Sequence, residues 1–159
     1  MKSIFLKPGK EESLKRFHPW VFSGAIHHMS EEPEEGEIVS VYTHKNEYIA
    51  TGHFQIGSIM VRVLSFEKEA IDQDFYERKL TIALDVRRRI GIIGNNNNTY
   101  RLVHGEGDNL PGLVIDVYGH TAVMQAHSVG MHKDRKILAS ALKNVMGDEV
   151  HNIFYKSET

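Results

Sequence analysis

The first seventy residues alternate short apolar runs with turn-forming residues, and this alternation is typical of β-strands. The predicted strands are Ser3–Leu6, Trp20–Met29, Glu37–Thr43, Tyr48–Phe54 and Ile59–Phe66. Between the first two strands, Lys10–Phe17 predicts one or two helical turns that end before Pro19, because a residue preceding proline disfavours the helical region. Many short strands separated by turns predict a small, mostly β barrel.

The hydrophobic period then changes from two to 3.6 residues, which predicts helices. Asp74–Ile90 has the pattern of an amphipathic helix, and the spacing of Asp74 and Glu77 predicts a capping box in which the Asp74 carboxylate accepts the Glu77 amide. The stripe expected to be buried is Tyr76, Leu80, Ala83, Leu84 and Ile90. A second helix is predicted at Lys133–Met146, and the strands predicted around it are Tyr100–His104, Leu113–Tyr118, Thr121–His127 and His151–Tyr155.

The change of period falls near residues 67–73, where charge and polarity also rise. The sequence therefore predicts an α+β protein with two domains, a β-barrel at residues 1–70 and a small α+β domain at residues 71–159.

Composition excludes several classes of site and location. The chain of 159 residues has no cysteine, which excludes disulfides, thiolate metal sites and a cysteine nucleophile within this sequence. No segment has the pattern of a signal peptide or is apolar enough to span a membrane. We therefore expect a cytoplasmic protein without a membrane partner.

Charge is unevenly distributed, although the formal net charge is only -2. Residues 1–30 hold five cations and two carboxylates, a net charge of +3, whereas residues 31–40 hold five glutamates. RNA contact would therefore have to use a local basic face, because phosphates attract clustered Lys and Arg rather than total charge.

A first candidate site is the segment Lys15–Gly24, in which two cations precede a turn fixed by Pro19 and a run of aromatic residues. Cations for phosphates, flat rings for bases and a glycine for close backbone approach are what RNA-binding modules use. The alternative is that Phe17, Trp20 and Phe22 are core residues and that the two cations lie on a solvated face.

A second candidate site is the glycine-rich segment Arg101–Gly112, which places His104, Glu106 and Asp108 at alternating positions. If this segment is extended, the three side chains share one face and could bind a divalent ion, as in a small metal-dependent hydrolase. We favour a turn in which Asp108 binds the backbone and in which Gly107 and Gly112 have positive φ. No metal site and no catalytic residue is therefore predicted.

Both segments resemble one enzyme family, the SAM-dependent methyltransferases that make 5-methylcytosine in large-subunit ribosomal RNA. The resemblance is carried by Leu6–Lys10, His18–Ile26, Val61–Ser65, Arg101–Asp108 and Leu110–Asp116, in the order expected for that family. It implies an N-terminal PUA barrel for RNA recognition at residues 1–70, followed by a central domain at residues 71–159. It also implies a C-terminal Rossmann-like catalytic domain, which this sequence does not contain.

The resemblance implies that the chain is the RNA-recognition and linker portion of such an enzyme and is not catalytic alone. The expected cofactor of the whole enzyme is S-adenosylmethionine, with no cofactor held by this chain. The expected partner is ribosomal RNA, and a homodimer is also allowed. A stand-alone RNA-binding module without activity is the alternative; unlike an enzyme portion, it should show no exposed apolar patch for another domain.

The residues expected to function fall into two groups. Candidate RNA contacts are Lys7, Lys10, Lys15, Arg16, His18 and Arg62. Candidate residues facing a pocket or another domain are Arg101, His104, Glu106 and Asp108.

Overall fold

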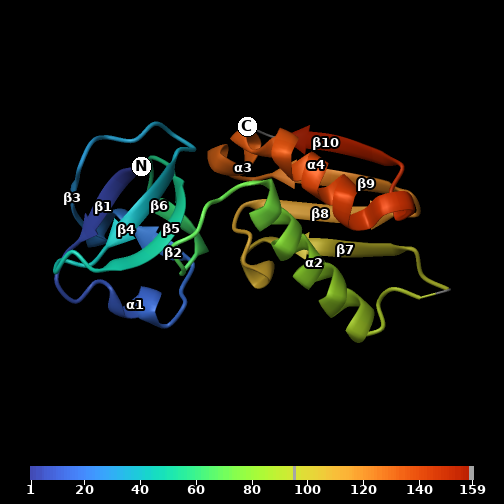
Figure 1. Ribbon diagram of the computed structural model, residues 1–159, viewed down its shortest axis with the longest axis horizontal. Helices are drawn as coiled ribbons and strands as arrows, with labels where there is room; N and C mark the ends of the chain where they lie inside the picture. Colours follow the sequence, from blue (N-terminus) through green and yellow to red (C-terminus); the bar gives the residue numbers. More distant parts are fainter. Residues whose placement is uncertain (95, 158–159) are drawn as a thin grey trace. The chain divides into compact units, whose positions relative to one another are not determined.

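The computed structural model describes residues 1–94 and 96–157 (Figure 1). Its elements form two compact units, Met1–Ala70 and Ile71–Thr159, and each unit has its own sheet. The predicted α+β fold class is confirmed. The assignment of separate functions to the two parts stays a prediction.

The first unit is a curled sheet of six short strands around a small apolar core. Its strands are β1 (Lys2–Leu6), β2 (Trp20–Phe22), β3 (Ile26–Met29), β4 (Ile38–Tyr42), β5 (Tyr48–Phe54) and β6 (Ile59–Ser65). They are hydrogen-bonded in the order β2-β6-β5-β4-β1-β3, with only β1 and β4 parallel. Alternation along each strand buries one set of side chains, among them Ile4, Val39, Val41 and Val61.

The strand predicted at Trp20–Met29 is wrong in one respect, because the chain breaks in its middle. The 3-10 turn η1 (Ser23–Ala25) separates β2 from β3, and these two strands are the opposite ends of the sheet order. Two backbone bonds hold the turn, from the Lys7 amide to the Ala25 carbonyl and from the Ser23 amide to the Ser58 carbonyl, both 2.9 Å. The sheet is therefore a half-barrel whose two ends are joined by a turn and not by strand pairing.

The helical turn predicted before Pro19 is present as the short helix α1 (Glu12–Lys15). Its one buried side chain, Leu14, belongs to the core cluster of the first unit. The helix is too short to be stable alone, so the packing of Leu14 is what holds it in place.

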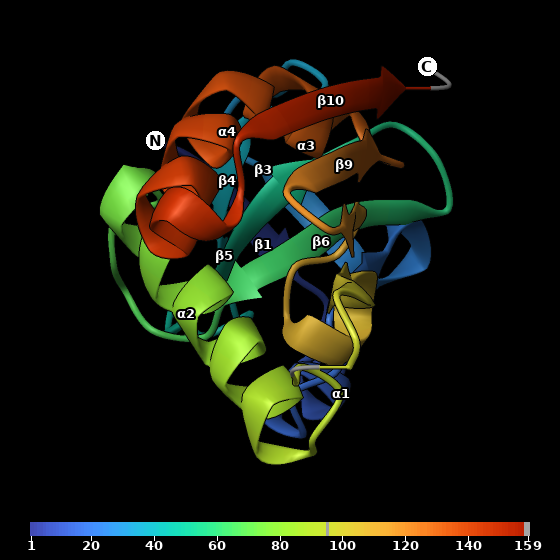
Figure 2. The ribbon, with the colours of Figure 1, turned by 90° about the vertical axis from the view of Figure 1, so that its right-hand side faces the viewer.

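The second unit is a four-stranded sheet with two helices packed on it. The strands are β7 (Thr99–His104), β8 (Leu113–Tyr118), β9 (Thr121–Ala126) and β10 (Asn152–Ser157), in the order β10-β9-β8-β7. The long helices α2 (Gln73–Arg89) and α4 (Arg135–Met146) lie side by side on one face of this sheet (Figures 1 and 2). Only β9 and β10 are parallel, and the helical connection between them supplies the crossover that parallel pairing needs.

The second predicted helix, Lys133–Met146, is present as α4, which begins at Arg135 and ends at Met146 as predicted, and a further short helix precedes it. Helix α3 (Val129–Lys133) precedes α4, and the Ser128 hydroxyl accepts the Met131 amide at its start. Asp134 separates the two helices and accepts a hydrogen bond from the Tyr76 hydroxyl. Burial raises the pKa of Tyr76 well above its ordinary value, so this phenol keeps the proton that it donates.

The start of α2 also differs from the prediction. The capping residue is Asp72, whose carboxylate accepts the Phe75 amide at 2.9 Å. The predicted cap by Asp74 is wrong, because the helix begins one residue earlier and Asp74 already lies in its first turn. Four members of the predicted stripe are buried, but Ile90 lies just past the helix end and is 63% exposed.

The glycine-rich segment forms the 3-10 turn η2 (Gly105–Asp108), and its side chains therefore do not alternate as on a strand. Asp108 binds the backbone as predicted, since its Oδ2 accepts the His104 amide at 2.6 Å. Gly112 has the predicted positive φ of +87°. The same prediction for Gly107 is wrong, and Gly105 takes that role with a φ of +49°.

Asp108 also ties this turn to helix α2. Its two carboxylate oxygens accept Nη1 and Nη2 of Arg87 at 2.5 and 2.8 Å, and both side chains are almost buried. The Arg87 Nε donates to the Arg101 carbonyl at 3.0 Å. One ion pair thus joins α2, β7 and η2.

Replacing Asp72 by alanine should lower the free energy of unfolding by about 1 kcal/mol, because the Phe75 amide loses its acceptor. Asp74→Ala should cost only about 0.3 kcal/mol, since that carboxylate acts only on the helix dipole. Urea unfolding of both variants checks the assignment. A larger loss of unfolding free energy for Asp74→Ala than for Asp72→Ala would support the capping box predicted from the sequence.

Removing the Asp108 carboxylate should be far more costly. We expect Asp108→Ala to lose about 3 kcal/mol, because Arg87 would remain largely buried without its counter-charge. The matched control is Glu149→Ala, which removes the exposed ion pair between Arg88 and Glu149 and should cost less than about 1 kcal/mol. Equal losses in chemical unfolding would show that burial of the Arg87 pair contributes nothing.

Candidate nucleic-acid interface

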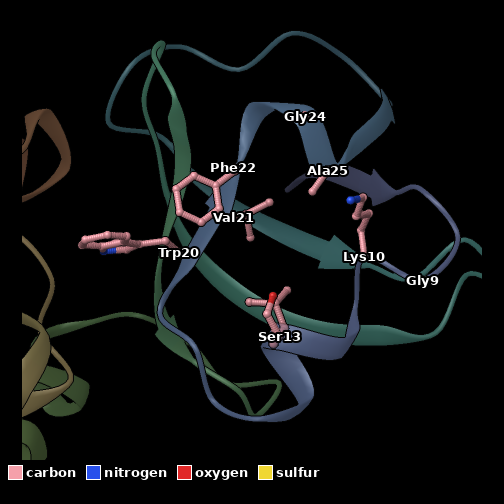
Figure 3. A pocket seen from close by; sticks show the side chains of 9 residues that line it. Gly9, Lys10, Ser13, Trp20, Val21, Phe22, Gly24 and Ala25 are labelled. Atoms are coloured by element: carbon pink, nitrogen blue, oxygen red, sulfur yellow. The ribbon is translucent and has the colours of Figure 1, made fainter.

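A hollow of about 460 Å³ opens where the half-barrel is not closed by strand pairing (Figure 3). Three segments form it: the turn after β1, helix α1, and edge strand β2 with η1. The lining residues are Gly9, Lys10, Ser13, Leu14, Trp20, Val21, Phe22, Gly24 and Ala25. Its position follows from the break at η1, because that break leaves one edge of β2 facing the hollow.

One wall of the hollow carries aromatic side chains that are not core residues. Along β2 the side chains alternate, so Val21 enters the core while Trp20 and Phe22 point the other way. Phe22 is 47% exposed, and Phe17, just before the strand, is 71% exposed. The alternative that these aromatics are core residues is therefore wrong for both phenylalanines, and Trp20 is only half-buried.

His18 completes a cluster of three rings with Trp20 and Phe22. The ring centroids lie 5.8 to 6.1 Å apart, mostly edge to face. The His18 Nδ1 accepts the Trp20 backbone amide at 3.2 Å, so in the neutral ring the proton lies on Nε2. This bond fixes the orientation of the imidazole and leaves the Nε2 proton as its donor.

The predicted cations are distributed unequally around the hollow. Lys10 lines it from the segment opposite β2, whereas the Trp20 indole extends from β2 away from Lys10 (Figure 3). Lys15 and Arg16 are exposed at the end of α1, and Lys7 is exposed directly after β1. Arg62 is the register partner of Trp20 on β6, but it is half-buried and is not among the lining residues.

The second predicted group lines another hollow, of about 580 Å³, within the second unit. Arg101, His104 and Asp108 line it together with Arg87, Gly107 and three apolar side chains, whereas Glu106 is exposed elsewhere. Arg101 donates to both oxygens of Asp116, at 2.8 and 3.2 Å. These hydrogen bonds raise the pKa of Arg101, so its charge is permanent and already paired.

The metal hypothesis for this segment finds no support in the described parts of the chain. Within residues 1–94 and 96–157, no three His, Asp or Glu side chains are placed to hold a metal ion. Both oxygens of Asp108 are occupied by Arg87, which explains why this carboxylate cannot serve as a ligand. The described helices also include none with the length and apolarity needed to cross a membrane.

Sequence reasoning missed some of the lining residues. Gly9, Ser13 and Ala25 were not singled out as site residues, although Pro8-Gly9 signalled a turn. Gly9 has a φ of +80°, so this turn needs its glycine. A turn signal alone does not say which distant strand the turn will face.

Comparisons with known proteins agree with the two-part resemblance. Residues 4–66 match the model of the PUA-like domain family. The chain is 43% identical over 145 residues to ribosomal RNA large subunit methyltransferase I of Shewanella amazonensis, covering 87% of this chain and 35% of that protein. It is 39% identical over 162 residues to the Aliivibrio fischeri protein of the same name, covering 98% of this chain and 39% of the relative.

Solved structures show the same fold. A protein of Streptococcus mutans described as a SAM-dependent methyltransferase superposes with a TM-score of 0.83 at 17% identity, over 99% of this chain and 41% of its own. A methyltransferase complexed with SAH gives a TM-score of 0.84, also at 17% identity, over 99% of this chain and 40% of its own. The chain spans little more than a third of the length of the curated relatives it matches. Residues 4–66 thus match the PUA-like domain family, and most of the chain is similar to part of ribosomal RNA large subunit methyltransferase I.

Proposed function

We propose that this chain is the RNA-recognition and linker portion of a SAM-dependent ribosomal RNA methyltransferase that makes 5-methylcytosine. The observation that carries the proposal is the hollow beside β2, which Lys10 lines together with the strand that bears Trp20 and Phe22. A cation and exposed rings around one hollow suit a polymer that offers both phosphates and bases.

Within this groove the residues would divide the work. Phosphates would be bound by Lys7, Lys10, Lys15 and Arg16. Neutralising phosphates with the ammonium group of lysine or the guanidinium group of arginine supplies much of a protein's affinity for nucleic acid. The exposed faces of Trp20 and Phe22 would contact bases, and the Nε2 proton of His18 would donate to RNA. Arg62 was predicted as a direct contact, but we now propose that it positions Trp20, its neighbour across the strand pair.

The second unit would connect this domain to the rest of the protein. Ile82 and Val86 lie on α2 and Ile90 lies just past its end, at intervals of four residues, and they are 62%, 42% and 63% exposed. Val86 and Ile90 also line the hollow that contains Arg101 and His104. Such an apolar stripe favours an enzyme portion over a stand-alone module, because isolated domains seldom expose adjoining large apolar residues.

Methyl transfer would depend on residues outside this sequence. The proposed chemistry uses a cysteine, and the chain has none. Among the described residues that line the two hollows, the only carboxylate is that of Asp108, and Arg87 occupies both its oxygens. These residues do not fit the ribose hydroxyls of SAM, so we propose that the cofactor is held by residues outside this sequence.

A calorimetric titration of SAH into this chain checks the location of the cofactor site. We expect no saturable heat, because neither hollow offers a carboxylate that is not already paired. A saturable curve with one site per chain would place cofactor binding within these residues and would contradict this part of the proposal.

RNA binding is tested by fluorescence anisotropy with a labelled large-subunit ribosomal RNA fragment at two salt concentrations. We expect the double variant Lys15→Glu/Arg16→Glu to lose affinity roughly tenfold or more, because two attractions become repulsions. The dependence of log affinity on log salt should also become shallower, by about 0.7 for each phosphate that the variant no longer neutralises.

The matched control is Lys133→Glu/Lys136→Glu, which makes the same change in charge at two exposed positions of the second unit. This variant should bind like the unmodified chain. Equal losses of affinity in the two variants would show that only the total charge of the chain matters. If the unmodified chain bound no RNA, the RNA-recognition role would be contradicted.

A further inference from the structure

Phe17 adopts a backbone conformation that is costly for its side chain. It has a φ of +65°, in the left-handed region that phenylalanine rarely enters. Its amide bonds to the Leu14 carbonyl at 2.9 Å, and the His18 amide bonds to the Ser13 carbonyl at 3.0 Å. This pair of bonds is the Schellman motif that ends many helices, and the residue at the position of Phe17 is usually glycine.

The Phe17 side chain contributes little to the stability of the fold. It is 71% exposed, so most of its apolar surface remains in water. Its ring makes an edge-to-face contact with Phe66, with centroids 5.3 Å apart, and Phe66 itself packs on the core of the first unit. The ring is therefore held on one side and open on the other, as a preformed contact surface would be.

The neighbours of Phe17 indicate which partner this ring fits. Lys15 and Arg16 precede it and are both exposed, and the cluster of His18, Trp20 and Phe22 follows it directly. Adjacent positive charge favours a polyanion over an apolar protein surface. Exposed rings beside cations are how proteins bind single-stranded nucleic acid, because each base offers a face for stacking.

We propose that Phe17 stacks on an unpaired base of the RNA bound at the neighbouring hollow. This inference rests on the proposed RNA-recognition function and adds a specificity to it. A base within a duplex has both faces covered by its neighbours, so the Phe17 ring favours loops, bulges and single strands over paired RNA. The stacking role explains why this strained turn has phenylalanine. Glycine would suit the backbone better, but it has no ring to stack on a base.

The test uses the variant Phe17→Gly, which removes the ring and at the same time suits the backbone. We expect its thermal midpoint to be equal to or higher than that of the unmodified chain. Its affinity for a labelled single-stranded RNA should fall about 5- to 150-fold, the range for losing one base–aromatic stack. Its weaker affinity for a fully paired duplex should not change, and Phe17→Tyr should bind single strands normally.

The matched control is Asn46→Gly, which relieves the same left-handed conformation, at φ +64°, in the turn between β4 and β5. It should leave RNA affinity unchanged. If the unmodified chain binds single strands and Phe17→Gly binds them equally well, the stacking role is overturned while the proposed function stands. An equal loss for single strands and duplex, or a lower thermal midpoint, would likewise overturn it. If the unmodified chain binds neither RNA, the proposed function fails and this inference fails with it.

Discussion

The 3-10 turn at Ser23–Ala25 is the constraint on which the candidate interface depends. It takes the chain from one end of the sheet order to the other, so β2 pairs only with β6 and β3 only with β1. A sheet closed by pairing of its end strands would have covered the edge of β2. The open edge instead leaves space for the hollow, whose opposite side is formed by helix α1 and the turn before it.

The same short strand serves both the fold and the candidate site. Because side chains alternate, Val21 is buried in the core while Trp20 and Phe22 face outward. The position of the exposed rings is therefore fixed by the packing of their neighbour. The ring of Phe17 is held differently, by an edge-to-face contact with Phe66. Its backbone lies in the left-handed region, which phenylalanine disfavours.

Charges have different roles in the two units. In the second unit, Asp108 holds Arg87 and the His104 amide, and Asp116 holds Arg101, so these groups join elements of the structure. This pairing explains why the segment Arg101–Gly112, although rich in charged side chains, serves to join elements of the structure. In the first unit, the cations around α1 are exposed. Exposed cations remain available to an external polyanion, which is what the proposed RNA role requires.

The sequence by itself determined the fold class and most strands, because the two-residue and 3.6-residue periods are local properties of the chain. Tyr48–Phe54 and Leu113–Tyr118 have the predicted bounds. The similarity to ribosomal RNA large subunit methyltransferases was also readable from the sequence, since the motifs that carry it are contiguous. Only the tertiary structure decided that Trp20–Met29 breaks in its middle and that Lys10 and Phe22 line one hollow. Each of these depends on where distant segments pack, and a local pattern carries no information about a partner that lies elsewhere in the chain.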